Sequence, residues 1–157
     1  MSLFRFFARK IFALVVLFLA VSFIGCKPEP DPENTGFIPV GEWTDDWGGS
    51  YKITASFLEF DDGFGSNFTG SIIEAVDFSK DAGVLLVQIT TSSTEGQADK
   101  FIGVYYKDYT ASHILLANAV DGSYTLILKG TLAEAKKIFT VDNVETHVTY
   151  WGTGYTK

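Results

Sequence analysis

The strongest structural signal in the chain is Gly83-Val84-Leu85-Leu86-Val87-Gln88-Ile89, which is apolar throughout except for Gln88. An apolar run of this length favours a strand that is covered on both faces or that crosses the packed end of a barrel. Turn-forming residues precede it at Asp81, and a polar connector begins after it at Ser92. We therefore expect a β-strand from Gly83 to Thr91.

Segments of similar character flank this strand on both sides. Each is rich in β-branched and aromatic residues and is bounded by Gly, Asp, Asn or Ser, which favour turns. In addition to Gly83–Thr91, we predict strands at Tyr51–Phe60, Phe68–Phe78, Phe101–Tyr106, His113–Ala119, Tyr124–Lys129 and His147–Trp151. The sequence therefore predicts an all-β domain in which an antiparallel meander closes into a small barrel.

One short helix is expected before the last strand. Thr131 followed by Glu134 has the spacing of a capping box, which satisfies backbone N–H groups at a helix start. Apolar residues from Leu132 to Phe139 share one face of this helix, and lysines occupy the other. We expect the helix to end near Phe139 and to pack on an end of the sheet or barrel.

The beginning of the chain differs from this domain. A basic start with Arg5, Arg9 and Lys10 precedes an apolar run that ends at Ile24. This order is typical of a secretory signal peptide, and the run is shorter than the roughly 20 residues of a transmembrane helix.

A proline-rich tether follows the apolar run. Pro28, Pro30 and Pro32 alternate with acidic residues, a pattern that disfavours helix and sheet and favours an extended polyproline II conformation. We therefore divide the 157 residues into a signal peptide at 1–25, a tether that begins with Cys26 at 26–36, and the barrel domain at 37–157.

The junction Phe23-Ile24-Gly25-Cys26 resembles a bacterial lipobox, with phenylalanine where the usual lipobox has leucine. The resemblance implies a lipoprotein. Cys26 would receive a diacylglycerol on its sulfur, the signal peptide would be removed, and the new amino terminus would be acylated, for example with palmitate. Acyl chains on Cys26 would then hold the protein on a membrane. Lys27 stands where an aspartate commonly retains such lipoproteins at the inner membrane. We therefore expect the outer membrane, with the domain on its periplasmic or surface side.

The composition limits the chemistry. A net charge of −7 argues against a nucleic-acid partner. The single cysteine excludes an intrachain disulfide, and His113 and His147 lack the spacing of metal ligands. The sequence contains no nucleophile elbow and no phosphate-binding loop. We therefore expect a protein that is not an enzyme and that needs no cofactor or metal.

Aromatic residues provide the candidate binding site. Gly41-Glu42-Trp43 lies just before the first predicted strand and resembles the Gly-x-Trp of small lipocalin-like domains. That resemblance implies that Trp43 closes one end of the barrel and that the interior binds small apolar ligands. We take Trp43, Tyr105, Tyr150 and Trp151 as candidate ligand-binding residues. Because Tyr105 and Tyr106 are adjacent in a strand, they point to opposite faces, and only one can line a given pocket.

Three function classes remain open. The first is a non-catalytic, membrane-anchored binding module for a small apolar ligand. The second is a structural or adhesive lipoprotein that binds a partner protein through its outer face. The third is a small hydrolase that uses paired carboxylates, for which the candidates are Asp45, Asp46, Asp61 and Asp62.

Overall fold

The computed structural model describes residues 36–156. The expected signal peptide, Cys26 and all of the tether except Gly36 lie outside the described residues. Within residues 36–156, no helix has both the length and the apolar character that crossing a membrane requires.

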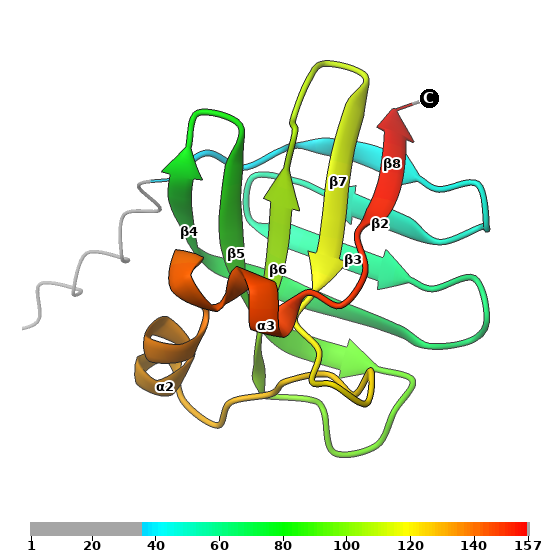
Figure 1. The fold of residues 1–157 in the computed structure, drawn as a ribbon. Helices are drawn as coiled ribbons and strands as arrows, with labels where there is room; N and C mark the ends of the chain where they lie inside the picture. The colour runs from blue at the N-terminus through cyan, green and yellow to red at the C-terminus, as the bar shows by residue number, and fades with distance from the viewer. Residues whose placement is uncertain (1–35, 157) are drawn as a thin grey trace, which may run out of the picture. The chain divides into compact units, whose positions relative to one another are not determined.

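The described residues form eight antiparallel strands in a closed barrel (Figure 1). The strands are β1 Gly41–Thr44, β2 Ser50–Ile53, β3 Phe57–Asp61, β4 Asn67–Ser79, β5 Ala82–Ser92, β6 Phe101–Lys107, β7 His113–Asn118 and β8 Gly152–Thr156. Each strand pairs with the next in sequence, and β8 returns to pair with β1 through Trp43–Thr156 and Thr44–Tyr155. The predicted antiparallel meander that closes into a barrel is confirmed.

The prediction of a single strand at Tyr51–Phe60 was wrong, because these residues form a hairpin of the two strands β2 and β3. Thr54 and Phe57 close the turn: the Thr54 backbone N–H donates to the Phe57 carbonyl at 2.8 Å, and the Phe57 N–H donates to Thr54 Oγ1 at 3.0 Å. After the turn, the inward-facing positions fall on even-numbered residues. Ile53 and Leu58 are therefore cross-strand partners, and both are buried.

The prediction also missed β1. Trp43 lies within this strand and not before the first strand, since Trp43 pairs with Tyr51 of β2 and with Thr156 of β8. The strand has only four residues, too few for a clear periodic pattern in the sequence. Its position is fixed by pairing with both neighbours.

Two further strand predictions were wrong. Residues Tyr124–Lys129 make only isolated bridges, Val120–Leu126 and Phe101–Lys129. Residues 147–151 precede the last strand, which begins at Gly152. Glycines at 152 and 154 weaken the sequence signal for a strand, but Gly154 permits close contact, since a Cβ there would lie 3.1 Å from Cβ of Trp43.

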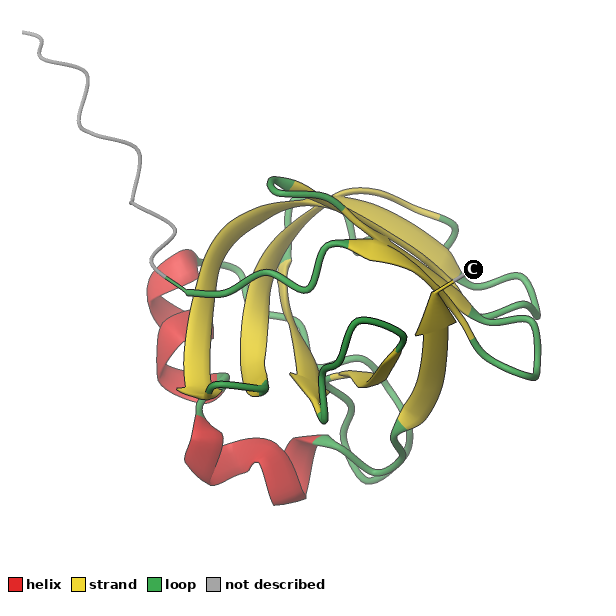
Figure 2. Ribbon diagram, turned by 90° about the horizontal axis from the view of Figure 1, so that it is seen from above, coloured by secondary structure: helices red, strands yellow, loops and turns green. Residues whose placement is uncertain are grey.

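The helix before the last strand is confirmed. Helix α2, Leu132–Ile138, has Thr131 as its N-cap and the full capping box with Glu134, and it ends at Phe139. Two short elements that the sequence did not predict follow it, the 3-10 helix η1 at Val141–Asn143 and the helix α3 at Val144–His147. In Figure 2 the helices lie outside the ring of strands.

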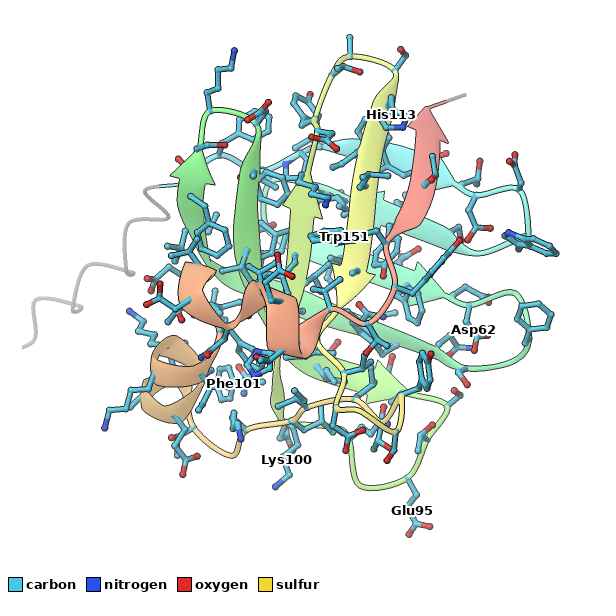
Figure 3. The ribbon with its side chains drawn as sticks, in the orientation of Figure 1. Asp62, Glu95, Lys100, Phe101, His113 and Trp151 are labelled. Carbon is cyan, nitrogen blue, oxygen red and sulfur yellow. The ribbon has the colours of Figure 1, made fainter. Side chains whose placement is uncertain are left out.

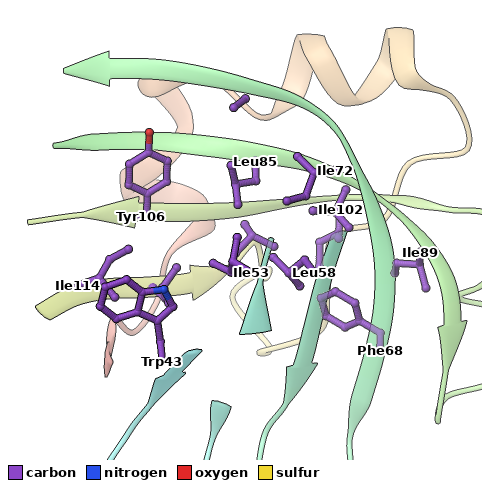
Figure 4. Packing of buried hydrophobic residues seen from close by; sticks show 14 residues of the cluster. Trp43, Ile53, Leu58, Phe68, Ile72, Leu85, Ile89, Ile102, Tyr106 and Ile114 are labelled. Carbon is purple, nitrogen blue, oxygen red and sulfur yellow. The ribbon is translucent and has the colours of Figure 1, made fainter. Parts of the chain in front are cut away.

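Two hydrophobic clusters lie on opposite faces of the barrel wall. The inner cluster lies inside the barrel and includes Trp43, Leu58, Phe68 and Tyr106 (Figure 4). The outer cluster lies between the wall and the helices, and its buried members are Val84, Leu86, Tyr105, Ala119, Ala135 and Phe139. The strand β5 contributes to both, with Leu85 inside and Val84 and Leu86 outside, which explains why it is apolar at successive positions.

One end of the barrel is closed by the segment that precedes β1. The ring centroid of Phe37 lies 4.7 Å from that of Tyr109, and Tyr109 lies 5.9 Å from Trp43. The Tyr106 hydroxyl lies within hydrogen-bonding distance of two acceptors, the Phe37 carbonyl at 3.2 Å and Asp77 Oδ1 at 3.1 Å. Because antiparallel strands alternate in direction, the β1–β2, β3–β4 and β5–β6 loops all lie at the other end.

Candidate functional site

A cavity of about 710 Å³ occupies the end of the barrel where the β1–β2, β3–β4 and β5–β6 loops meet. Its volume is within the usual range of small-molecule sites, about 300–1,000 Å³. It is lined by residues of the barrel wall and of these loops, namely Trp43, Asp45, Gly49, Ser50, Tyr51, Phe60, Asp62, Phe64, Ser66, Asn67, Phe68, Thr94, Gln97, Leu116, Ala117, Asn118, Val120, Tyr124, Thr125, Leu126, Tyr150, Gly152, Thr153 and Gly154.

The inner wall of the cavity is mainly apolar. Ring centroids of Tyr51 and Phe60 lie 4.9 Å apart, and those of Phe60 and Phe68 lie 5.2 Å apart. These three rings come from consecutive strands, β2, β3 and β4. Trp43 lines the cavity and also packs on Tyr109 at the closed end, so it contacts both halves of the interior.

The rim of the cavity carries exposed aromatic side chains. Phe64 in the β3–β4 loop is 81% exposed, Tyr124 after β7 is 71% exposed, and Tyr150 before β8 is 68% exposed. All three also line the cavity. Large exposed rings around a concave site are typical of surfaces that bind a ligand or a partner.

A polar position lies on the wall at Asn118. Its backbone N–H is hydrogen-bonded to the Tyr51 hydroxyl oxygen. Burial, together with the negative charge of Asp45, raises the pKa of Tyr51 well above its ordinary value, so this hydroxyl stays protonated. The Oδ1 atom of Asn118 is buried and has no hydrogen-bond partner among the described residues. A buried acceptor without a donor is costly.

Two carboxylates, Asp45 and Asp62, also line the cavity. Asp45 Oδ1 accepts from the N–H groups of Trp47 at 2.9 Å and of Gly49 at 2.7 Å. Asp62 Oδ1 accepts from Phe64 at 2.7 Å and from Ser66 at 2.9 Å. Burial acts to raise the pKa of Asp62, but hydrogen bonds from Phe64, Ser66 and Gly65 lower it below its usual value, so this carboxylate is ionised at neutral pH.

The remaining carboxylates of the hydrolase alternative are Asp46 and Asp61, and neither lines the cavity. Asp61 Oδ1 accepts from the Gly63 N–H at 2.8 Å, a contact that closes its own turn. No group of three or more metal-ligating side chains occurs among residues 36–156.

Two of the four candidate binding residues taken from the sequence line the cavity, Trp43 and Tyr150. Tyr105 is instead fully buried in the outer cluster. Trp151 packs against the same cluster, with Nζ of Lys107 4.4 Å from its ring centroid. The predicted opposition of Tyr105 and Tyr106 is confirmed, because Tyr106 points into the barrel.

Sequence reasoning missed several wall residues, including Tyr51, Phe60 and Asn118. The alternation of residues in the first predicted strand gave a signal for Tyr51, which shares a face with Ile53. Phe60 lies beyond the turn at 54–56, where the alternation changes phase, and Asn118 carried no signal because it is the only polar inward residue of an apolar strand.

Comparisons with family models, with curated proteins and with solved structures found no match to this chain.

Proposed function

We propose that this protein is a membrane-anchored lipoprotein whose barrel is a non-catalytic binding module for a small, largely apolar ligand. The observation that supports the module best is the cavity of about 710 Å³ with its aromatic wall and exposed rim. The anchor rests on the lipobox-like Phe23-Ile24-Gly25-Cys26 and on the proline-rich tether. Lipid chains on Cys26 would hold the barrel at the cell envelope, on the periplasmic or surface side of the outer membrane.

The chemistry of the wall favours binding over catalysis. Trp43, Phe60 and Phe68 offer apolar surface, and burying it on a ligand is worth about 25 cal/mol per Å². Asp45, Asp62 and Asn118 are among the polar residues of the lining. Such a combination, a mainly apolar wall with polar side chains beside it, is typical of sites that bind small molecules.

Native mass spectrometry and calorimetric titration test this function. We expect the purified full chain to carry a bound molecule, seen as an added mass that disappears on denaturation. When the chain is purified empty, we expect it to bind the neutral probe naphthylmethanol. The variant Gly152→Phe should abolish binding by filling the cavity, since Gly152 lines it and a Cβ there meets no atom nearer than 3.4 Å.

The matched control is Gly122→Phe. A Cβ at Gly122 would meet nothing within 4 Å, and Gly122 does not line the cavity, so binding should be unchanged. An empty protein that binds neither naphthylmethanol nor a charged analogue of the same shape, or equal binding by Gly152→Phe and the wild type, would exclude a ligand site in the barrel.

A further inference from the structure

The cavity lining contains two carboxylates and no basic side chain. We propose, building on the binding function above, that the ligand is an apolar organic cation, an ammonium group attached to an aromatic or aliphatic body. The charge would lie at the rim near Asp45 and Asp62, and the apolar body would extend toward Trp43.

The two carboxylates belong to neighbouring loops. Asp45 begins the β1–β2 loop and Asp62 begins the β3–β4 loop. These loops pack closely through glycines, since a Cβ on Gly63 would lie 2.9 Å from the backbone of Gly48. Both residues have positive φ, 75° and 92° respectively, which glycine adopts without strain. This contact places both acids on one side of the cavity mouth.

No cation of the described part of the chain neutralises these acids. The ion pairs there join Lys52 to Glu42 and Lys136 to Glu74, and neither involves Asp45 or Asp62. Lys100, in the β5–β6 loop, is exposed and points away from the barrel, as does Glu95 (Figure 3). An anionic ligand would therefore meet repulsion at the mouth, whereas a cation would meet attraction that grows as water is displaced.

The aromatic rim strengthens this preference. Phe64, Tyr124 and Tyr150 present exposed rings in the same cavity as the acids, and the face of an aromatic ring attracts an organic cation. The acids and the rings therefore favour the same class of ligand.

Three probes of similar shape separate this inference from the binding function itself. They are naphthylmethylammonium, neutral naphthylmethanol and anionic naphthylacetate, each titrated calorimetrically into the full chain at neutral pH. We expect the cation to bind at least about tenfold more tightly than the anion, with the neutral alcohol between them. We also expect added salt to weaken cation binding, because the acids lie near solvent.

The charge variant is Asp45→Asn with Asp62→Asn. Asparagine keeps the side-chain oxygen that accepts the turn hydrogen bonds, so the loops should keep their shape. We expect this variant to lose most of the preference for the cation over the anion. The control, Asp142→Asn with Glu145→Gln, makes the same change in net charge on exposed residues of η1 and α3, and it should keep the full preference.

The outcomes are distinguishable. Failure of all three probes would exclude the ligand site and this inference with it. Binding of the alcohol with no preference for the cation over the anion would exclude only the inference. An equal loss of preference in the control variant would assign the effect to overall charge and would also overturn it.

Discussion

The hydroxyl oxygen of Tyr105 lies 3.2 Å from Nδ1 of His147. This contact joins the outer face of β6 to the end of α3. The His147 carbonyl also accepts the Val120 N–H at 2.8 Å, and the chain continues from His147 to Tyr150 at the cavity rim. Burial, and then the positive charge of Lys129, lower the pKa of His147 below its ordinary value.

Stability should therefore depend on pH through His147. The unfolded chain binds a proton near pH 6.5, whereas the folded chain resists protonation until a lower pH, so the free energy of unfolding should fall as pH drops below about 6.5. Urea unfolding of the wild type and of His147→Gln from pH 7.5 to 5.5 measures this difference. The difference in unfolding free energy between the wild type and the variant should shrink as pH falls. If the two free energies instead change in parallel with pH, His147 does not contribute to the pH dependence of stability.

Helix α2 docks on β6 through a glycine. A Cβ on Gly103 would lie 2.7 Å from the ring of Phe139, the buried residue that ends the helix. We expect Gly103→Ala to lower the free energy of unfolding by about 1–3 kcal/mol because the ring must move away. Gly122→Ala is the control, since Gly122 has open space around it, and it should change stability by less than about 0.5 kcal/mol.

The contribution of the capping box to the free energy of unfolding should be measurable by the same kind of substitution. Thr131 Oγ1 accepts the Glu134 N–H at 3.3 Å, and Thr131→Ala should cost about 1 kcal/mol. Thr140 is the N-cap of η1 but makes no side-chain capping bond, so Thr140→Ala should cost clearly less. Equal effects of the two substitutions in urea unfolding would mean that the capping box adds nothing beyond the threonine side chain itself.

Lipidation at Cys26 can be tested by mass spectrometry of the protein and by membrane fractionation. We expect the protein made in a diderm bacterium to carry the mass of acyl chains and to sediment with membranes, and Cys26→Ser to lose both. Phe23→Leu restores the usual lipobox residue and should be processed at least as well as the wild type. An unmodified Cys26 in the wild type would contradict the lipoprotein assignment.

Local patterns were sufficient for much of the fold. Some signals act within a single element and can therefore be recognised from the sequence. They are the apolar run at β5, the aromatic and β-branched segments of β4, β6 and β7, and the capping box at Thr131. The hairpin at 54–56 and the loop at 124–129 were misassigned, because apolar and β-branched residues occur both in strands and in segments that cross a barrel end.

The binding cavity required contacts between distant segments. Tyr51, Asn118 and Tyr150 come from β2, from β7 and from the segment before β8, and only barrel closure brings them together. Tyr105 and Tyr106 were correctly expected on opposite faces, but which of them faces inward depends on where α2 covers the wall.

The amino-acid sequence thus determined the strand-rich character of the domain, the antiparallel meander and the capped helix, because these follow from residue periodicity and capping. Only the tertiary structure decided the placement of β1 and β8 and the face of the barrel wall on which each aromatic ring lies. It also decided that Asp45 and Asp62 line the same cavity. The physical reason is that pairing and burial are set by neighbours far apart in the chain, and the short glycine-containing segment β8 is defined as a strand by its pairing with β1 and β7.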